Sequence, residues 1–140
     1  MTHFNHCAIG AYHSFFIDTS SNLWGFGNNK YAQLGLGDKR ERNLPENMQN
    51  SSQIISVCAG GSHSIFIDLH GDVFTCGNNE CGQLGLGNST NRNIPTKIKN
   101  LSQIISISAG DNHSMFLDIN GTVYMWMEPV WATGIARHTR

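Results

Sequence analysis

Charged side chains are scarce in this 140-residue chain: Lys, Arg, Asp and Glu make up 14% of it, and the formal net charge is −1. A nucleic-acid-binding surface needs clustered Lys and Arg, so this composition argues against direct binding of nucleic acid. Long apolar runs are also missing, and none reaches the length that crosses a bilayer. The N-terminus has no basic start followed by an apolar stretch. We therefore expect an intracellular protein, cytoplasmic or nuclear, that is neither secreted nor bound to a membrane.

Helical patterning is absent as well. No window of a dozen residues keeps a 3.6-residue apolar period without Gly or Pro, which excludes helical repeats. The chain does contain 15 glycines and 39% hydrophobic residues, a composition that favours a folded protein of short strands and turns over a disordered chain.

A repeat with a constant offset dominates the sequence. His13, His63 and His113 are each followed by Ser, and the same offset of 50 residues separates the members of each pair that follows. The pairs are Gly27-Asn-Asn and Gly77-Asn-Asn, Gln33-Leu-Gly-Leu-Gly and Gln83-Leu-Gly-Leu-Gly, and Arg42-Asn-Leu-Pro and Arg92-Asn-Ile-Pro.

One repeat unit predicts four short strands, the antiparallel pattern of a propeller blade. The fourth is expected to start at Pro95, where no ladder donor is needed. The expected strands cover residues 54–59, 64–68, 72–76 and 95–98, and the expected units cover 4–49, 50–99 and, incompletely, 100–126. The fold class predicted is all-β: an incomplete β-propeller of four-stranded antiparallel blades.

These motifs resemble a known family. Ala59-Gly-Gly-Ser-His-Ser64, Asp68 with Gly71, and the run from Gly77 to Gly87 are similar to the regulator of chromosome condensation repeat. The resemblance covers nearly all of residues 4–126. It implies a seven-bladed propeller with about 50 residues per blade, whose strands are split across the repeat boundary so that one repeat completes its neighbour's blade.

The three repeated histidines invite a metal or catalytic interpretation, which the repeat argues against. Equivalent positions in successive blades form a ring around the propeller axis and do not converge on one point. We interpret the imidazoles as buried framework, hydrogen-bonded to backbone near a blade junction. The predicted structural framework is His13, His63, His113, Gly27, Gly77, Gly35, Gly37, Gly85 and Gly87.

The four cysteines and the glycine runs have similarly structural interpretations. Cys7, Cys76 and Cys81 occupy places where another repeat carries a large apolar or aromatic residue, which predicts small buried hydrophobes. No disulfide or zinc site is expected from the four cysteines, Cys58 included. The glycine runs complete no dinucleotide fingerprint. No nucleophile, acid, base or metal set is predicted, and no cofactor, so we expect a protein that is not an enzyme.

Two loops differ between repeats that are otherwise alike. Residues 38–42 read Asp-Lys-Arg-Glu-Arg, whereas residues 88–92 read Asn-Ser-Thr-Asn-Arg. Non-equivalent loops on equivalent scaffolds are where binding specificity is expected. The candidate partner-contact residues are Asp38, Lys39, Arg40, Arg42 and Arg92.

After Trp126 the repeat pattern stops, and residues 127–140 are predicted to form a non-repeat tail. The codons of this tail permit Asn-Gln-Phe-Gly-Gln-Leu-Gly-Leu in a reading frame shifted by one nucleotide, which suggests a frameshift and a fragment of a longer repeat protein. Two and a half units are fewer than the ~4 blades that a propeller needs to close. We therefore expect open blade edges and self-association through them.

Three functions fit these patterns. The first is a non-enzymatic protein-interaction scaffold. The second, implied by the resemblance, is a module like a guanine-nucleotide exchange factor that acts on a Ran-type small GTPase. The third is a truncated remnant of a larger repeat protein, such as a HECT-type ubiquitin ligase.

Overall fold

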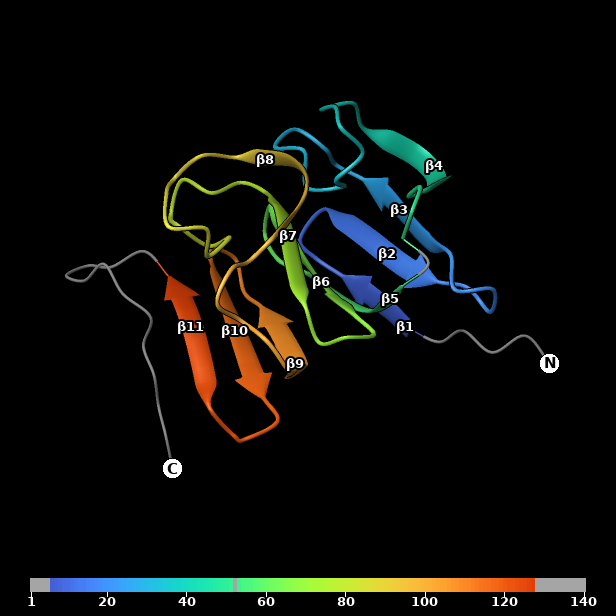
Figure 1. Ribbon diagram of the computed structural model, residues 1–140. Coiled ribbons are helices and arrows are strands. Elements are labelled where there is room, and N and C mark those ends of the chain that lie inside the picture. The colour runs from blue at the N-terminus through green and yellow to red at the C-terminus, as the bar shows by residue number, and fades with distance from the viewer. Residues whose placement is uncertain (1–5, 52, 128–140) are drawn as a thin grey trace.

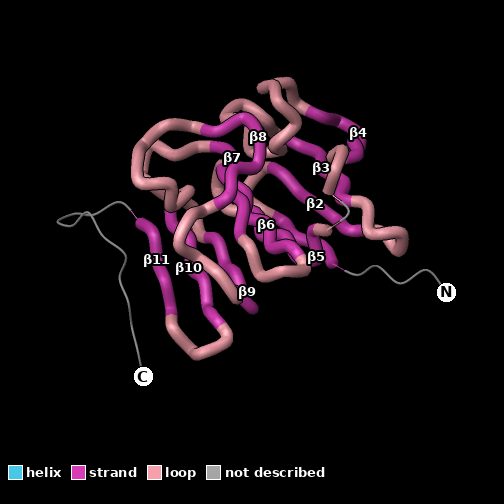
Figure 2. The backbone as a smooth tube through the Cα atoms, in the orientation of Figure 1, coloured by secondary structure: helices cyan, strands magenta, loops and turns pink. Residues whose placement is uncertain are grey.

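The computed structural model describes residues 6–51 and 53–127, and all regular structure in this part is β strand (Figure 2). The strands form three antiparallel sheets, which we call blades 1, 2 and 3 in chain order (Figure 1). Blade 1 has the order β1 (His6–Ile9), β2 (His13–Ile17), β3 (Leu23–Gly27) and β4 (Arg42–Asn47). Blade 2 has β5 (Ile54–Ala59), β6 (His63–Asp68), β7 (Val73–Gly77) and β8 (Arg92–Lys97); blade 3 has β9 (Ile104–Ala109), β10 (His113–Asp118) and β11 (Val123–Met127).

The all-β class and the four-stranded antiparallel sheets confirm the prediction from the repeat. Strand β8 differs from expectation because it begins at Arg92, so Pro95 lies inside the strand. The sheet tolerates this proline because β8 is an edge strand, paired only with β7, and its register shifts between Thr75 and Gly77. Residues 128–140, most of the predicted tail, lie outside the described residues.

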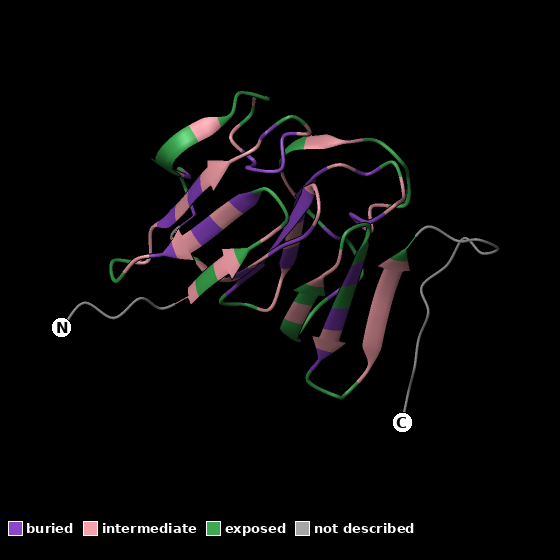
Figure 3. Cartoon of the chain, turned by 180° about the vertical axis from the view of Figure 1, so that it is seen from behind, coloured by how far each residue is buried: buried purple, intermediate pink, exposed green. Residues whose placement is uncertain are grey.

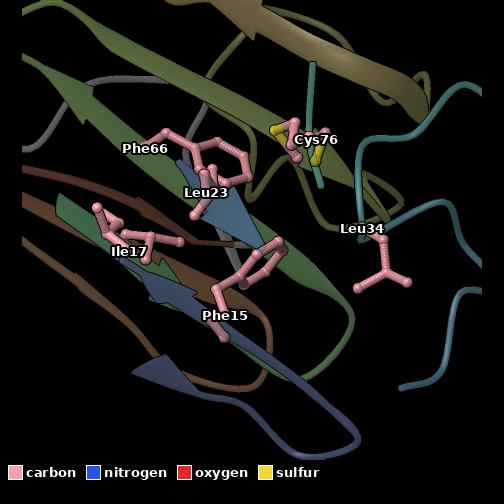
Figure 4. Packing of buried hydrophobic residues seen from close by; sticks show 9 residues of the cluster. Phe15, Ile17, Leu23, Leu34, Phe66 and Cys76 are labelled. Carbon is pink, nitrogen blue, oxygen red and sulfur yellow. The ribbon is translucent and has the colours of Figure 1, made fainter. Parts of the chain in front are cut away.

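Successive residues of each central strand point to opposite blades. In β6, Phe66 packs in the core cluster that it shares with Phe15 and Ile17 of blade 1, as the close view in Figure 4 shows. The rings of Phe15 and Phe66 meet edge to face, with centroids 5.4 Å apart. This two-residue alternation makes blade 2 an apolar layer between blades 1 and 3.

The opposite side of blade 2 packs against blade 3. Ile65 and Ile67 belong to a second cluster with Val73, Ile104 and Phe116, and all five side chains are almost completely buried. Figure 3 shows the burial of each residue, and buried positions are concentrated in β6 and β7 of the middle blade. The core therefore consists of two similar blade junctions, not one central cluster.

The prediction that Cys7 is a small buried hydrophobe is wrong, because Cys7 is exposed. Its equivalent in blade 2, Val57, is only 2% exposed because it faces blade 1. Cys7 lies on the side of blade 1 that no other described blade covers. Cys76 is fully buried, and Cys58 and Cys81 are partly buried.

Candidate interaction face

The long β3–β4 and β7–β8 loops leave the sheets at one end of the molecule. The amide of Asn28 donates to the carbonyl of Tyr12 at 2.8 Å, and the amide of Asn78 donates to that of Ser62 at the same distance. Each loop therefore begins beside the tight turn that joins the first two strands of its own blade. The loops of blades 1 and 2 lie side by side at this end (Figure 1).

Two buried asparagines hold these loops in shape. Asn29 Nδ2 donates to the carbonyls of Asp38 and Arg40, both at 3.0 Å, and its Oδ1 accepts from the Leu34 amide. Asn79 makes the equivalent bonds in blade 2. This role was not predicted from the sequence, although the duplicated Gly-Asn-Asn motif marks both asparagines as part of the repeat.

Each loop also packs against the next blade. The amide of Gly37 donates to the carbonyl of Asn93 at 2.9 Å, which joins the blade 1 loop to the start of β8. Gly35 packs so closely that a Cβ there would lie 3.0 Å from the sulfur of Cys76. Gly85 has the same place in blade 2 and packs against Trp126 of blade 3. The glycine runs thus join neighbouring blades.

The repeated histidines lie at the blade junctions. His13 Nε2 is 2.8 Å from Ser64 Oγ of blade 2, and that hydroxyl donates to the carbonyl of Gln33 in blade 1 at 2.6 Å. His63, Ser114 and Gln83 form the same chain of bonds between blades 2 and 3. The sequence predicted a backbone partner for the imidazole. The Nε2 partner is a serine side chain from the next blade, and the pKa of His13 responds to burial first and also to a hydrogen bond with the backbone of His63.

This arrangement defines the protonation of both rings. Since the single hydroxyl proton of Ser64 goes to a carbonyl, His13 Nε2 must carry the proton that it shares with Ser64, and Nδ1 is left as an unpaired acceptor. Burial lowers the pKa of His13 and of His63 to about 4, because an imidazolium would lose its hydration there. Both imidazoles are neutral structural groups at neutral pH.

The remaining predicted framework residues have distinct positions. His113 is exposed, since no described blade follows blade 3. Gly27 and Gly77 end β3 and β7 directly opposite His13 and His63. Gly87 is exposed at the tip of the blade 2 loop.

The candidate contact residues of blade 1 are not equivalent to one another. Arg42 forms a bidentate ion pair with Asp38, with both distances 3.0 Å, and also bonds Glu46. The Arg42 guanidinium and the Arg40 amide hold the pKa of the Asp38 carboxyl well below its usual range. The Arg42 side chain is only 11% exposed, and its charge is balanced by ion pairs with Asp38 and Glu46.

Two other cations of this end, Lys39 and Arg40, face solvent. The Arg40 side chain is 82% exposed, although its guanidinium also pairs with Asp38 at 3.2 Å, and Lys39 is exposed with no hydrogen bond or ion pair among the described residues. In blade 2 the place of Asp38 is taken by Asn88, so Arg92 lacks the ion pair of its equivalent and makes no side-chain bond in the described part. The Gly37–Asn93 hydrogen bond brings these residues into one neighbourhood. We call Lys39, Arg40 and Arg92 the cationic patch.

Residues 6–51 and 53–127 contain no group of three or more His, Cys, Asp or Glu side chains that could hold a metal ion. Within the same residues there is no helix long and apolar enough to cross a membrane.

Solved structures with the same arrangement are propellers. The chain matches yeast RCC1 (Prp20) from a complex with Kap60, with a TM-score of 0.80 and 25% identity, over 89% of this chain and 32% of that chain. It matches human WBSCR16 with a TM-score of 0.79 and 25% identity, over 90% of this chain and 34% of that chain. The sheets are thus blades of an incomplete propeller, as the sequence predicted.

Curated relatives match over shorter stretches. Human "Probable E3 ubiquitin-protein ligase HERC4" is 37% identical over 59 residues, 41% of this chain and 6% of that protein. F-box only protein 24 of Macaca fascicularis is 35% identical over 54 residues, 39% of this chain and 9% of that protein. The chain therefore spans a small fraction of the curated relatives that it matches.

The family model of the regulator of chromosome condensation (RCC1) repeat matches residues 20–67 and 70–117. A second model of the same repeat matches residues 54–83. Each longer match begins near the end of β2 or β6 and ends in the second strand of the next blade, so the sequence repeat straddles two structural blades. The matched residues cover more than half of the chain, which belongs to the RCC1 repeat family.

Proposed function

We propose that this chain is a non-enzymatic protein-interaction module whose cationic patch binds an acidic segment of a partner protein. The observation that carries the proposal is the difference between two equivalent arginines. Arg42 is paired with Asp38, whereas at Arg92 the place of that carboxylate is taken by Asn88, and the Arg92 side chain makes no hydrogen bond or ion pair within the described residues. A guanidinium offers a planar fork of donors that suits a carboxylate.

The scaffold below the patch supports this function. Asn29 and Asn79 fix the backbone of the two loops, so Lys39, Arg40 and Arg92 are presented from an ordered support. A preorganised surface loses less conformational entropy when it binds. Similar proteins bind other proteins: yeast RCC1 (Prp20) is bound to Kap60 in one solved structure, and a second structure of Prp20p was solved together with its binding properties to Gsp1p and histones.

A peptide titration tests the proposal. The probe is a Glu-rich peptide, and its affinity is measured by calorimetry at low salt. Arg40→Glu combined with Arg92→Glu should weaken binding at least tenfold, because two attractive contacts become repulsive. The matched control is Lys99→Glu, an exposed cation outside the patch, which should change affinity less than twofold. Equal losses in both variants would contradict a specific patch.

The second candidate is exchange-factor activity on a Ran-type small GTPase. It is favoured by the likeness to Prp20p of Saccharomyces cerevisiae, at 26% identity and a TM-score of 0.80, because Prp20p binds Gsp1p. Release of a fluorescent guanine nucleotide from a purified Ran-type GTPase separates the candidates. We expect no acceleration by this chain. Acceleration that the Arg40→Glu/Arg92→Glu variant abolishes would assign exchange activity instead.

The third candidate is a part of a larger repeat protein such as a HECT-type ubiquitin ligase. The 37% identity to HERC4 within 59 residues is the observation that favours it. Sequencing the transcript beyond the codons for residues 127–140 tests it: further repeats in a shifted frame would support a larger protein.

A further inference from the structure

The outer faces of blades 1 and 3 are unlike an ordinary protein surface. Directly opposite residues of antiparallel strands share a face. The register therefore defines a leading face on blade 1, which points away from blade 2, and a trailing face on blade 3, which also points away from blade 2. The leading face consists of Cys7, Ile9, Ser14, Phe16, Trp24 and Phe26; the trailing face consists of His113, Met115, Leu117, Met125 and Met127.

Most positions of both faces are more deeply buried where they recur in the inner junctions. Ile9 on the leading face is 82% exposed, whereas its equivalent Ala59 is 7% exposed. Met115 on the trailing face is 39% exposed, whereas Phe15 and Ile65, its equivalents, are 1% and 0% exposed. In the described residues nothing covers either face, and contiguous exposed apolar surface indicates an interaction site.

The hydrogen-bonding groups on the two faces are the missing halves of one junction. His113 is equivalent to His13 and His63, which bond the serine of the next blade, and it makes no side-chain hydrogen bond in the described part. Ser14 is equivalent to Ser64 and Ser114, and it too makes none there. The trailing face thus offers the histidine of a junction, and the leading face offers the serine.

The apolar groups are complementary as well. The leading face presents aromatic rings, with Phe16 stacked on Trp24 at a centroid distance of 6.2 Å. The trailing face presents Met115, Met125 and Met127. Methionine side chains adapt to irregular surfaces, and their sulfur atoms make favourable contacts with aromatic rings. An aromatic face and a methionine face can therefore pack without the preformed fit of the inner junctions.

We propose that the leading face of one chain binds the trailing face of a second copy, with Ser14 of one copy against His113 of the other. The contact repeats the geometry of the two inner junctions. Blade 1 of the second copy stacks on blade 3 of the first copy in the same way that blade 3 stacks on blade 2. The interface is heterologous, and such contacts produce either a ring or an open chain of copies. It uses faces and not the strand edges that the sequence suggested.

Sedimentation velocity over about a hundredfold range of protein concentration tests this. Wild-type chain should shift from monomer to dimer and larger species. Ser14→Arg blocks the leading face and Met115→Arg blocks the trailing face, so each variant alone should remain monomeric. The matched control Ser20→Arg, at the exposed β2–β3 turn, should associate like the wild type.

Mixing the two blocked variants is the decisive arm. Ser14→Arg retains a trailing face and Met115→Arg retains a leading face, so an equimolar mixture should form a dimer of one copy of each and nothing larger. This dimer also demonstrates that both variants are folded. A wild-type chain that stays monomeric, blocked variants that associate alone, or a mixture without dimers would each overturn the proposal.

Two further readouts test the register of the contact. His113→Ala should weaken association about two- to tenfold, the range expected for loss of one hydrogen bond. Alkylation of Cys7 should slow as the concentration rises, because its equivalent Val57 is buried in a junction, while Cys58, which faces blade 3, should react at an unchanged rate. Unchanged association in His113→Ala together with unprotected Cys7 would overturn the assigned register.

Discussion

Ser64 of blade 2 accepts a hydrogen bond from His13 Nε2 at 2.8 Å and donates its own proton to the carbonyl of Gln33 at 2.6 Å, so one hydroxyl joins two separate segments of blade 1. Ser114 repeats this relationship one blade later, at 2.9 and 2.7 Å. The recurrence makes the pair of bonds a property of the blade junction and not of one position.

Removing the junction hydroxyl should destabilise the fold. Ser64→Ala removes the serine partner of the buried His13 Nε2–H and leaves the Gln33 carbonyl with only the Cys76 thiol, 3.5 Å away. We expect a loss of about 1–3 kcal/mol in the free energy of unfolding. The matched control is Ser14→Ala, the equivalent residue without a junction partner among the described residues, which should change stability by less than about 0.5 kcal/mol at low protein concentration. Urea unfolding of both variants measures the difference; equal losses would contradict the role assigned to Ser64.

The two neutral histidines should make the fold sensitive to mild acid. Their folded pKa of about 4 is below the ordinary 6.5, so between these values the unfolded chain binds protons that the folded chain does not. Stability is therefore fully present above pH 6.5 and decreases as the pH falls towards 4, by roughly 2 kcal/mol for each histidine at pH 5. Urea midpoints measured from pH 7.5 to 4.5 check this. His63→Gln should flatten the profile, and an equally steep profile in that variant would exclude His63 as a source.

Substitutions in the long loops should lower stability more where the loop packs against the next blade than where it has no neighbour. Gly82 and Gly85 both have positive φ, at 70° and 68°, but a Cβ on Gly82 meets nothing within 4 Å, whereas one on Gly85 would lie 2.8 Å from Trp126. Blade 1 already carries Ala32 at φ 63° in the place of Gly82. Gly82→Ala should therefore cost about 1 kcal/mol for backbone strain alone, and Gly85→Ala clearly more. Thermal unfolding compares them; a smaller loss for Gly85→Ala would contradict the packing of this loop on blade 3.

Much of this architecture could be predicted because the repeat offset aligns equivalent residues. The offset identified the strands, and it showed that His13, His63 and His113 belong to successive blades and do not converge on one site. Contacts between blades could not be predicted, because the offset shows which residues are equivalent and not which residues of neighbouring blades touch. The pairing of His13 with Ser64 is a contact over 51 residues, one more than the repeat, and only three-dimensional packing brings the two together.

The candidate interaction face shows the same limit. Sequence differences located the variable loops at residues 38–42 and 88–92, but they gave Arg42 and Arg92 the same status. The structure separates the two arginines, because Asp38 pairs with the Arg42 guanidinium and no carboxylate of the described residues pairs with that of Arg92. The exposure of Cys7 was missed for a related reason. A cysteine aligned with buried residues is buried only if a neighbouring blade covers its side of the sheet.

The blade junctions stabilise the scaffold, and we propose that the cationic patch binds the partner. Substitutions at a junction and in the patch should therefore change stability and affinity independently. The most direct measurement is the affinity for the Glu-rich peptide, determined at pH 7.5 and well below the unfolding temperature, in Arg92→Glu and in Ser64→Ala. We expect Arg92→Glu to weaken binding several-fold without loss of stability, and Ser64→Ala to lower stability without changing the affinity. An Arg92→Glu variant that binds like the wild type, while Ser64→Ala does not, would contradict the proposal.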